Sequence, residues 1–358
     1  METFFPLTVQ EVIHETPDAV TLAFLPEENT HFAYQAGQYL TLRLHIAGKT
    51  FRRAYSLSTS PLDKKLHITV KKVAGGAVST YLCQAVEKGA KMEALPPMGD
   101  FTFQKATEKG KSYFMFAGGS GITPIFSNLK TILQTEPQSN VYLLYGNKNK
   151  ESIIFNKELT QLLAQYPQRF VLKYVLEEGE KKTWFSSFFS QKNENEAMYE
   201  GRADARITHL FLDKYRPQHR KVEYFVCGPT EMMNGIESLL LARGIAAENL
   251  RIERFSPVEN KTIAADAPIV ATLTAHLNGE KVVVAMREGQ TVLEALLQAG
   301  QDPPYSCRTG SCATCIGKCT SGKVKMKVNA TLEDGEIAEG LVLTCQSVPL
   351  TEAVEIWY

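Results

Sequence analysis

Four cysteines near the end of the chain constrain its fold more than any other feature of the sequence. Three of them lie within the segment PPYSCRTGSCATC at the spacing C-x4-C-x2-C, and a fourth follows in VLTCQS after 29 intervening residues. They are Cys307, Cys312, Cys315 and Cys345. The first residues, METFFPLTVQEVIHET, lack the basic and then apolar pattern of a secretion signal, so we expect a cytoplasmic protein with reduced thiols. Under these conditions clustered cysteines indicate metal ligands or redox groups rather than disulfides.

The spacing of these cysteines distinguishes two kinds of metal site. Zinc sites usually combine two short Cys or His pairs, whereas three ligands from one tight loop and a distant fourth match plant-type [2Fe–2S] ligation. A loop with Gly310 and the small residues Ser311 and Ala313 can wrap closely around two bridged irons. We therefore predict that the four cysteines hold an iron–sulfur cluster, with zinc as the alternative. Cys319 is interpreted as a packed thiol outside the ligand set.

Charge and hydrophobicity exclude some classes of partner. The 358 residues include 39 Lys and Arg and 39 Asp and Glu, which argues against a nucleic-acid surface or a basic membrane patch. No segment reaches the ~18 consecutive apolar residues of a membrane helix. Residues 268–358 have seven basic and ten acidic side chains, which indicates a separate, mildly acidic module. We expect no nucleic-acid partner and no membrane span.

Hydrophobic patterning divides the chain into three domains. Residues 1–106 contain five or six runs rich in β-branched and aromatic residues, separated by turn residues, which predicts an antiparallel β-barrel. Residues 107–256 alternate short apolar strands with amphipathic helices, which predicts a parallel sheet covered on both faces. The polar segment 191–207 interrupts this pattern and is interpreted as an insertion or mobile loop. Residues 257–267 are predicted to be a linker, and residues 268–358 a third domain with a hairpin, a helix, the cysteine loop and late strands.

Glycine-rich motifs mark candidate anion sites. In FMFAGGSGITP a buried strand runs into a glycine turn and a helix, with Thr123 as the expected N-cap and Pro124 as the first helical residue. Backbone amides at such a helix start suit a pyrophosphate, although the segment is not a full G-x-G-x-x-G fingerprint. The segment FVCGP ends the last core strand, at the edge where open α/β sheets bind ligands. Each motif alone is also compatible with an ordinary turn.

The barrel region has a second pair of motifs. In RAYSLST, Arg53 and Tyr55 alternate along one strand and so point to the same side, where a cation and an aromatic plane can contact one ligand. In KKVAGGAVST a glycine turn precedes a helix start with Ser79 and Thr80, which again suits an anion. A surface arginine beside a core tyrosine, and a common turn, remain the alternative interpretations.

In this order, the motifs RxYS, GG-x-x-S, AGGSGITP, CGP and C-x4-C-x2-C…C resemble the ferredoxin–NADP⁺ reductase family with a C-terminal plant-type ferredoxin domain. The resemblance spans nearly the whole chain. It implies a flavin-binding β-barrel, an α/β nucleotide domain and an α+β β-grasp ferredoxin domain. Within the family, the chain is most similar to reductase components of phenylacetyl-CoA epoxidases, and then to those of Rieske-type ring- and steroid-hydroxylating oxygenases.

The resemblance implies an NAD(P)H-dependent flavin and iron–sulfur oxidoreductase. Electrons would pass from the nucleotide through FAD to a [2Fe–2S] cluster and then to an oxygenase, such as the diiron component of a phenylacetyl-CoA epoxidase. Reductases of Rieske-type oxygenases are the alternative. An alternative of another class is a non-catalytic redox sensor or a zinc-binding module.

The family motifs also assign roles to residues of this chain. Flavin contacts are expected from Arg53, Tyr55, Ser56, Val70, Lys72, Gly76, Val78, Ser79, Thr80 and, closing over the ring, Phe255. Nucleotide contacts are expected from Gly118, Gly119, Gly121, Thr123, Pro124, Lys148, Cys227, Gly228 and Pro229. Support of hydride transfer is expected from Ser56, Cys227 and Glu253. Lys148 and Lys150, just after the YGN segment, favour NADPH, whereas a carboxylate at that strand end would favour NADH, which stays possible.

Overall fold

The structure is a computed structural model. It describes residues 4–26, 33–63, 65–106, 109–178, 199–255, 267–277, 279–301, 303–305, 308, 310, 314–329 and 332–358. Its contacts divide the chain into two compact units, residues 1–42 with 55–253 and residues 43–54 with 254–358. Most of the predicted linker 257–267, and the predicted cluster ligands Cys307 and Cys312, lie outside the described residues.

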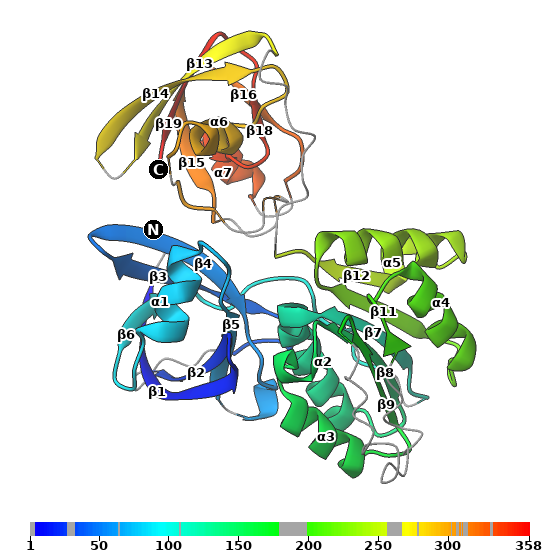
Figure 1. Ribbon diagram of the computed structural model, residues 1–358. Coiled ribbons are helices and arrows are strands. Elements are labelled where there is room, and N and C mark those ends of the chain that lie inside the picture. The colour runs from blue at the N-terminus through cyan, green and yellow to red at the C-terminus, as the bar shows by residue number, and fades with distance from the viewer. Residues whose placement is uncertain are drawn as a thin grey trace. The chain divides into compact units, whose positions relative to one another are not determined.

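An antiparallel sheet of six strands forms the first part of the chain (Figure 1). In spatial order its strands are β4 (Lys49–Ser56), β3 (Tyr39–Ile46), β6 (Lys91–Ala94), β1 (Phe5–Thr16), β2 (Ala19–Pro26) and β5 (Leu66–Lys71). An isolated bridge between Leu57, which follows β4, and Ile68 within β5 joins the two edge strands. The sheet is therefore nearly closed, which confirms the predicted barrel. A short helix, α1 (Ala77–Gln84), packs beside β5.

A parallel sheet follows along the chain. In spatial order its strands are β10 (Tyr199–Glu200), β9 (Phe170–Leu176), β8 (Asn140–Asn147), β7 (Ser112–Gly118), β11 (Val222–Cys227) and β12 (Leu250–Glu253). All neighbouring pairs are parallel. The helices are α2 (Ile122–Thr135), α3 (Asn156–Gln165), α4 (Ala205–Lys214) and α5 (Thr230–Ala242).

The central strands of this sheet are nearly continuous apolar segments because a separate hydrophobic core lies on each face of the sheet. Tyr113 and Met115 of β7 face α2 and α3, whereas Phe114 and Phe116 face α4 and α5. The strands β7, β8 and β9 are thus buried on both faces, as expected for a parallel sheet covered by helices. Figure 1 shows α2 and α3 on one side of the sheet and α4 and α5 on the other.

One sequence prediction in this region is partly wrong. The segment 191–207 was predicted to be an insertion or mobile loop, but residues 199–207 contain β10 and the first turn of α4. Asp204 caps that helix, since its side chain accepts a hydrogen bond from the backbone N–H of Ile207 at 2.8 Å. Within the described residues 199–207, the segment thus forms an edge strand and a helix N-terminus. Residues 179–198 are not described.

The remaining part of the chain contains a mixed five-stranded sheet. Its strands in spatial order are β14 (Glu280–Arg287), β13 (Ile269–Leu277), β19 (Ala353–Trp357), β15 (Ile316–Ser321) and β17 (Leu341–Leu343), and β16 (Val324–Met326) pairs with β18 (Ser347–Pro349). The helices are α6 (Val292–Gln298) and α7 (Asp334–Ala338). The hairpin, helix and late strands agree with the prediction. Among the described helices of the whole chain, none combines the length and apolarity needed to cross a membrane.

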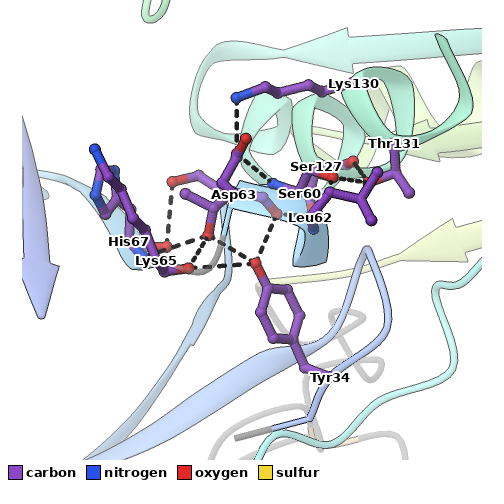
Figure 2. A network of polar contacts seen from close by, with 11 residues as sticks. Tyr34, Ser60, Leu62, Asp63, Lys65, His67, Ser127, Lys130 and Thr131 are labelled. Atoms are coloured by element: carbon purple, nitrogen blue, oxygen red, sulfur yellow. Dashed lines mark hydrogen bonds and ion pairs between the residues drawn. The ribbon is translucent and has the colours of Figure 1, made fainter. Parts of the chain in front are cut away.

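Polar contacts attach the barrel to helix α2 within the first unit (Figure 2). The Lys130 ammonium lies 2.7 Å from the carboxylate of Asp63, and the Thr131 hydroxyl donates to Ser60 at 2.9 Å. Tyr34 donates to the Thr59 hydroxyl at 2.9 Å, and its burial raises its pKa to about 12. The loop after β4 is thereby held against the helix that follows β7. This arrangement brings the end of β4 to the carboxyl edge of the parallel sheet.

Candidate functional site

The carboxyl edge of the parallel sheet gathers the predicted nucleotide and catalytic residues. In the strand register, Ala117 of β7 lies beside Cys227 of β11, which in turn lies beside Glu253 of β12. The AGGSG turn therefore leaves the sheet next to the CGP turn. Parallel α/β sheets bind ligands at this edge, where strand ends leave a crevice.

The two turns pack against each other through their backbones. A Cβ atom at Gly121 would collide with the carbonyl oxygen of Cys227. A Cβ at Gly118 would lie 2.5 Å from Cδ of Pro229 and 2.7 Å from Sδ of Met232. Glycine is thus required at both positions for this packing. A Cβ at Gly119, in contrast, would meet no atom within 4 Å beyond its chain neighbours, so the main chain of the turn is open there and fits the predicted dinucleotide.

The helix after the AGGSG turn begins earlier than the sequence predicted. A short 3₁₀ turn, η2 (Gly119–Gly121), leads directly into α2, so Gly121 is the N-cap and helical residues start at Ile122. The prediction of Thr123 as N-cap and Pro124 as first helical residue was wrong. The Thr123 hydroxyl donates to the carbonyl of Ser120 at 3.0 Å and does not cap the helix. Pro124 still lies in the first turn, where a missing N–H costs little.

Ser56 and Cys227 are buried, and the half-buried Glu253 lies beside both of them within the first unit. The Ser56 hydroxyl donates to Oε2 of Glu253 at 3.3 Å. Burial raises the pKa of Glu253 to about 8, and the hydrogen bond from Ser56 opposes this only in part. Burial, together with the neighbouring Glu253, also raises the pKa of the Cys227 thiol. All three groups are consequently uncharged near neutral pH.

The predicted flavin contacts fall on β4, β5 and the start of α1. Arg53 and Tyr55 are two residues apart on β4, and the Arg53 guanidinium lies 5.7 Å from the centre of the Phe51 ring. Val70 is buried within β5, and Lys72 directly follows this strand. Phe255 is 44% exposed. These placements are compatible with the predicted roles and do not test them.

The start of α1 is a tight turn held by Ser79. Gly76 is its N-cap, and the Ser79 hydroxyl accepts from the N–H of Val73 at 3.1 Å while donating to the Gly76 carbonyl at 3.3 Å. Val78 and Thr80 lie in the first turn of the same helix. Backbone amides at a helix start suit an anion, which fits a flavin phosphate.

The predicted preference for NADPH depends on Lys148, and the structure pairs this lysine with a carboxylate that the sequence analysis missed. Lys148 follows β8, and its ammonium lies 3.3 Å from Oε1 of Glu178, which follows the neighbouring strand β9. Asn149 donates to the other oxygen of Glu178 at 3.1 Å. The side chain of Asn147 is buried, and among the described residues neither of its polar atoms has a hydrogen-bond partner. The preference for NADPH stays a prediction, and the pairing of Lys148 with Glu178 counts against it.

Two of the four predicted cluster ligands are described. Cys315 and Cys345 are 2% and 4% exposed and share one apolar cluster with Leu293, Leu332 and Leu343. Both the backbone N–H and the hydroxyl of Thr344, the residue before Cys345, donate to the Cys315 carbonyl, at 3.1 and 2.8 Å. Two buried thiols in an apolar pocket form a donor set that fits an iron–sulfur cluster.

Cys319 lies on strand β15, away from this pocket. Its thiol donates to the carbonyl of Ser321 at 3.5 Å, and its side chain packs against the core that contains Leu273 and Val354. Burial raises its pKa. This is the position expected of a packed thiol.

Three known protein families match successive parts of the chain. Residues 6–103 match the oxidoreductase FAD-binding domain, residues 115–238 the oxidoreductase NAD-binding domain, and residues 275–350 the 2Fe-2S iron-sulfur cluster binding domain. The cofactors are therefore FAD, a nicotinamide nucleotide and a [2Fe–2S] cluster, and the chain is an oxidoreductase. The zinc alternative and the non-catalytic alternative find no support in these matches. The predicted domain boundaries enclose the matched ranges and stay a prediction.

Curated relatives match over almost their full length. One subunit of the 1,2-phenylacetyl-CoA epoxidase of Escherichia coli is 34% identical over 99% of this chain and 98% of its own. The ferredoxin reductase component of the 3-ketosteroid-9-alpha-monooxygenase of Mycobacterium tuberculosis is 33% identical over 98% and 95%. The glycine betaine monooxygenase reductase of Pseudomonas aeruginosa is 29% identical over 96% and 93%.

A solved structure has the same domain content. Phthalate dioxygenase reductase, described as a modular structure for electron transfer from pyridine nucleotides to [2Fe-2S], covers 99% of this chain and 98% of its own at a TM-score of 0.57 and 19% identity. At that identity the match supports the fold and no finer property.

Proposed function

Because the chain belongs to the ferredoxin–NADP⁺ reductase family, in the branch with a C-terminal 2Fe-2S domain, we propose that the diiron oxygenase component of a phenylacetyl-CoA epoxidase receives its electrons. The observation that supports this acceptor is the end-to-end match, at 34% identity, with one component of that epoxidase. The coarser function, an electron-transfer reductase of an oxygenase system, does not depend on this choice. We also propose a cytoplasmic location.

FAD, when bound, takes two electrons together from the nicotinamide nucleotide and gives them up singly, and the cluster carries single electrons. We assign the pyrophosphate of the nucleotide to the AGGSG turn, where the amides at the start of α2 can donate to it. Arg53 supplies a cation for the flavin phosphates, and Tyr55 supplies an aromatic plane. Cys315 and Cys345, with Cys307 and Cys312, hold the cluster.

The chain's contribution near the reacting rings is a buried, uncharged surface. Glu253 retains its proton up to a pH of about 8, and Ser56 donates to it. Cys227 likewise stays a neutral thiol. Such a surface excludes water and places no fixed negative charge beside the bound rings. Glu253 can also hold or release a proton at Oε2 close to them.

A second acceptor is favoured by its own observation. A reductase component of a ketosteroid monooxygenase is 33% identical over almost the whole chain, nearly as similar as the epoxidase component. A Rieske-type ring- or steroid-hydroxylating oxygenase is therefore the alternative acceptor. Only the terminal partner differs between the two proposals.

Reconstitution with purified oxygenase components tests the acceptor. The flavin- and cluster-loaded reductase would be mixed with the phenylacetyl-CoA epoxidase oxygenase or with a ketosteroid hydroxylase, and nucleotide consumption coupled to product would be measured. We expect coupled turnover with the epoxidase component. Coupled turnover with the hydroxylase alone would replace the first proposal by the second. A preparation without flavin absorbance or acid-labile sulfide would contradict the function itself.

A further inference from the structure

Gln346, the residue after Cys345, makes contacts that its position in the sequence does not explain. Its side chain is buried, with 9% exposed. Nε2 donates to the carbonyl oxygen of Arg308 at 2.7 Å and approaches Sγ of Cys345 at 3.8 Å. Its backbone N–H donates to Leu343, and its carbonyl accepts from Lys327, at 2.8 and 2.9 Å. The carboxamide therefore points from a well-held backbone toward the cysteine loop.

The contact with Arg308 connects two segments that are distant in the chain. Arg308 directly follows Cys307 and has a left-handed backbone with φ 54°. Two residues later, Gly310 also has positive φ, and a Cβ there would lie 3.1 Å from Cγ of Gln346. Arg308 and Gly310, within the three-cysteine segment, thus lie against the Gln346 side chain. One amide group contacts both the loop and the fourth cysteine.

Gln290, a buried glutamine elsewhere in the same domain, serves as a comparison because its role is purely structural. Gln290 is 3% exposed; its oxygen accepts from the N–H of Arg287 at 2.9 Å, and its nitrogen donates to Gln298 at 2.6 Å. Both of its partners are ordinary neutral groups. Gln346 differs because one of its acceptors is a sulfur atom that becomes a thiolate when metal binds.

An N–H group directed at a ligand sulfur has a predictable electrostatic effect. Reduction adds negative charge to an iron–sulfur cluster, and donors to its sulfurs stabilise the reduced form and raise the reduction potential. The effect is strong where the donor is shielded from water, because the local dielectric constant is low. Cys345 and Gln346 are both buried, which meets this condition.

We propose that Gln346 is a positioning residue for the iron–sulfur site: its carboxamide holds the three-cysteine loop against Cys345 and raises the reduction potential of the cluster. The inference rests on the proposed role of Cys345 as a ligand. A hydrogen bond to a charged acceptor is stronger than one between neutral groups, and the long N–S distance weakens it. We expect its loss to lower the equilibrium constant for cluster reduction about threefold to tenfold, which is ~30–60 mV for one electron.

Potentiometric titration of the holoprotein, followed by electron paramagnetic resonance, tests the proposal. Gln346→Met keeps the length and removes the donor, and Gln346→Glu adds a carboxylate in its place. We expect the potential to fall in the order wild type, Gln346→Met, Gln346→Glu. Gln290→Met is the matched control, since it removes a buried amide whose hydrogen bonds go to Arg287 and Gln298, and its potential should equal that of the wild type.

The outcomes separate this inference from the proposed function. If Gln346→Met binds a full cluster at an unchanged or higher potential, the inference is wrong while the ligand assignment stands. A fall in potential of the same size in Gln290→Met would also overturn it, because the effect would then be general destabilisation. Cys345→Ser is the separate test of the ligand, and an unaltered cluster spectrum in that variant would reject the assignment itself.

Discussion

Glu253 should make the stability of the protein depend on pH in a way that one substitution abolishes. It lies beside Cys227 in the strand register, and burial raises the pKa of its carboxyl to about 8 from an ordinary 4.5. The folded state therefore keeps the proton over a range in which the unfolded chain loses it. Glu253→Gln retains the size and polarity of the side chain but has no proton to lose.

The sign and the size of the effect follow from linkage. Between pH 4.5 and about 8 the folded state binds more protons than the unfolded state, so the free energy of unfolding falls as the pH rises. Each unit contributes ~1.4 kcal/mol, or about 5 kcal/mol over the whole interval. From pH 5 to pH 7, the stability of Glu253→Gln relative to the wild type should rise by about 3 kcal/mol. Below pH 4.5 this pH-dependent contribution is fully present, and it is lost as the pH passes 8.

Guanidinium denaturation at pH 5, 6, 7 and 8 measures this difference. The flavin-loaded wild type and variant would be followed by circular dichroism with FAD in equal excess. Glu231→Gln is a suitable control, because it makes the same chemical exchange at a side chain that is 92% exposed. If the difference between Glu253→Gln and the wild type stays constant within about 0.5 kcal/mol across this range, the carboxyl is ionised in the fold and the reasoning fails.

Three further predictions concern binding and electron flow. Arg53→Ala should purify with little FAD and little activity, as measured by the flavin-to-protein ratio; a variant with full flavin content would remove Arg53 from the site. Cys312→Ser should lose the visible absorbance and acid-labile sulfide of the cluster while NADPH still reduces the flavin, measured with ferricyanide as acceptor; an intact cluster would remove Cys312 from the ligand set. Glu178→Gln, by releasing Lys148 from its ion pair, should raise the ratio of kcat/KM for NADPH to that for NADH about threefold to tenfold, whereas Lys148→Ala should lower it. Unchanged ratios in both variants would show that neither side chain contacts the ribose.

The sequence predicted the parallel sheet because its central strands are buried on both faces. Segments such as SYFMFA and NVYLLYGNK are apolar at nearly every position, which only a strand between two helical layers requires. Element ends were predicted less well. Thr123 satisfied the local rule for an N-cap, but the 3₁₀ turn at Gly119–Gly121 had already started the helix. Packing of that turn on Cys227 decided the boundary, and no local rule contains it.

The position of Glu178 in the sequence could have predicted its ion pair with Lys148, but the sequence analysis did not use it. It ends the strand segment FVLKYVLEE, just as Lys148 ends NVYLLYGNK. Adjacent parallel strands bring their carboxyl ends to the same edge, so two charged residues at those ends meet whenever the strands are neighbours. The sequence did not establish the strand order, which places β9 directly beside β8. Strand order was the missing information, and with it the ion pair follows.

The contact between Ser56 and Glu253 could not be predicted from local sequence patterns, because 197 residues separate the two. No periodicity or spacing links them, and only the family motifs suggested that both lie near the flavin. The structure supplies the physical cause: α2 is held to the loop after β4 by Lys130 and Asp63, and α2 starts from the turn that packs on Cys227. Strand β12 then lies beside β11 in register. The site therefore depends on the attachment of the barrel to α2 as much as on the residues within it.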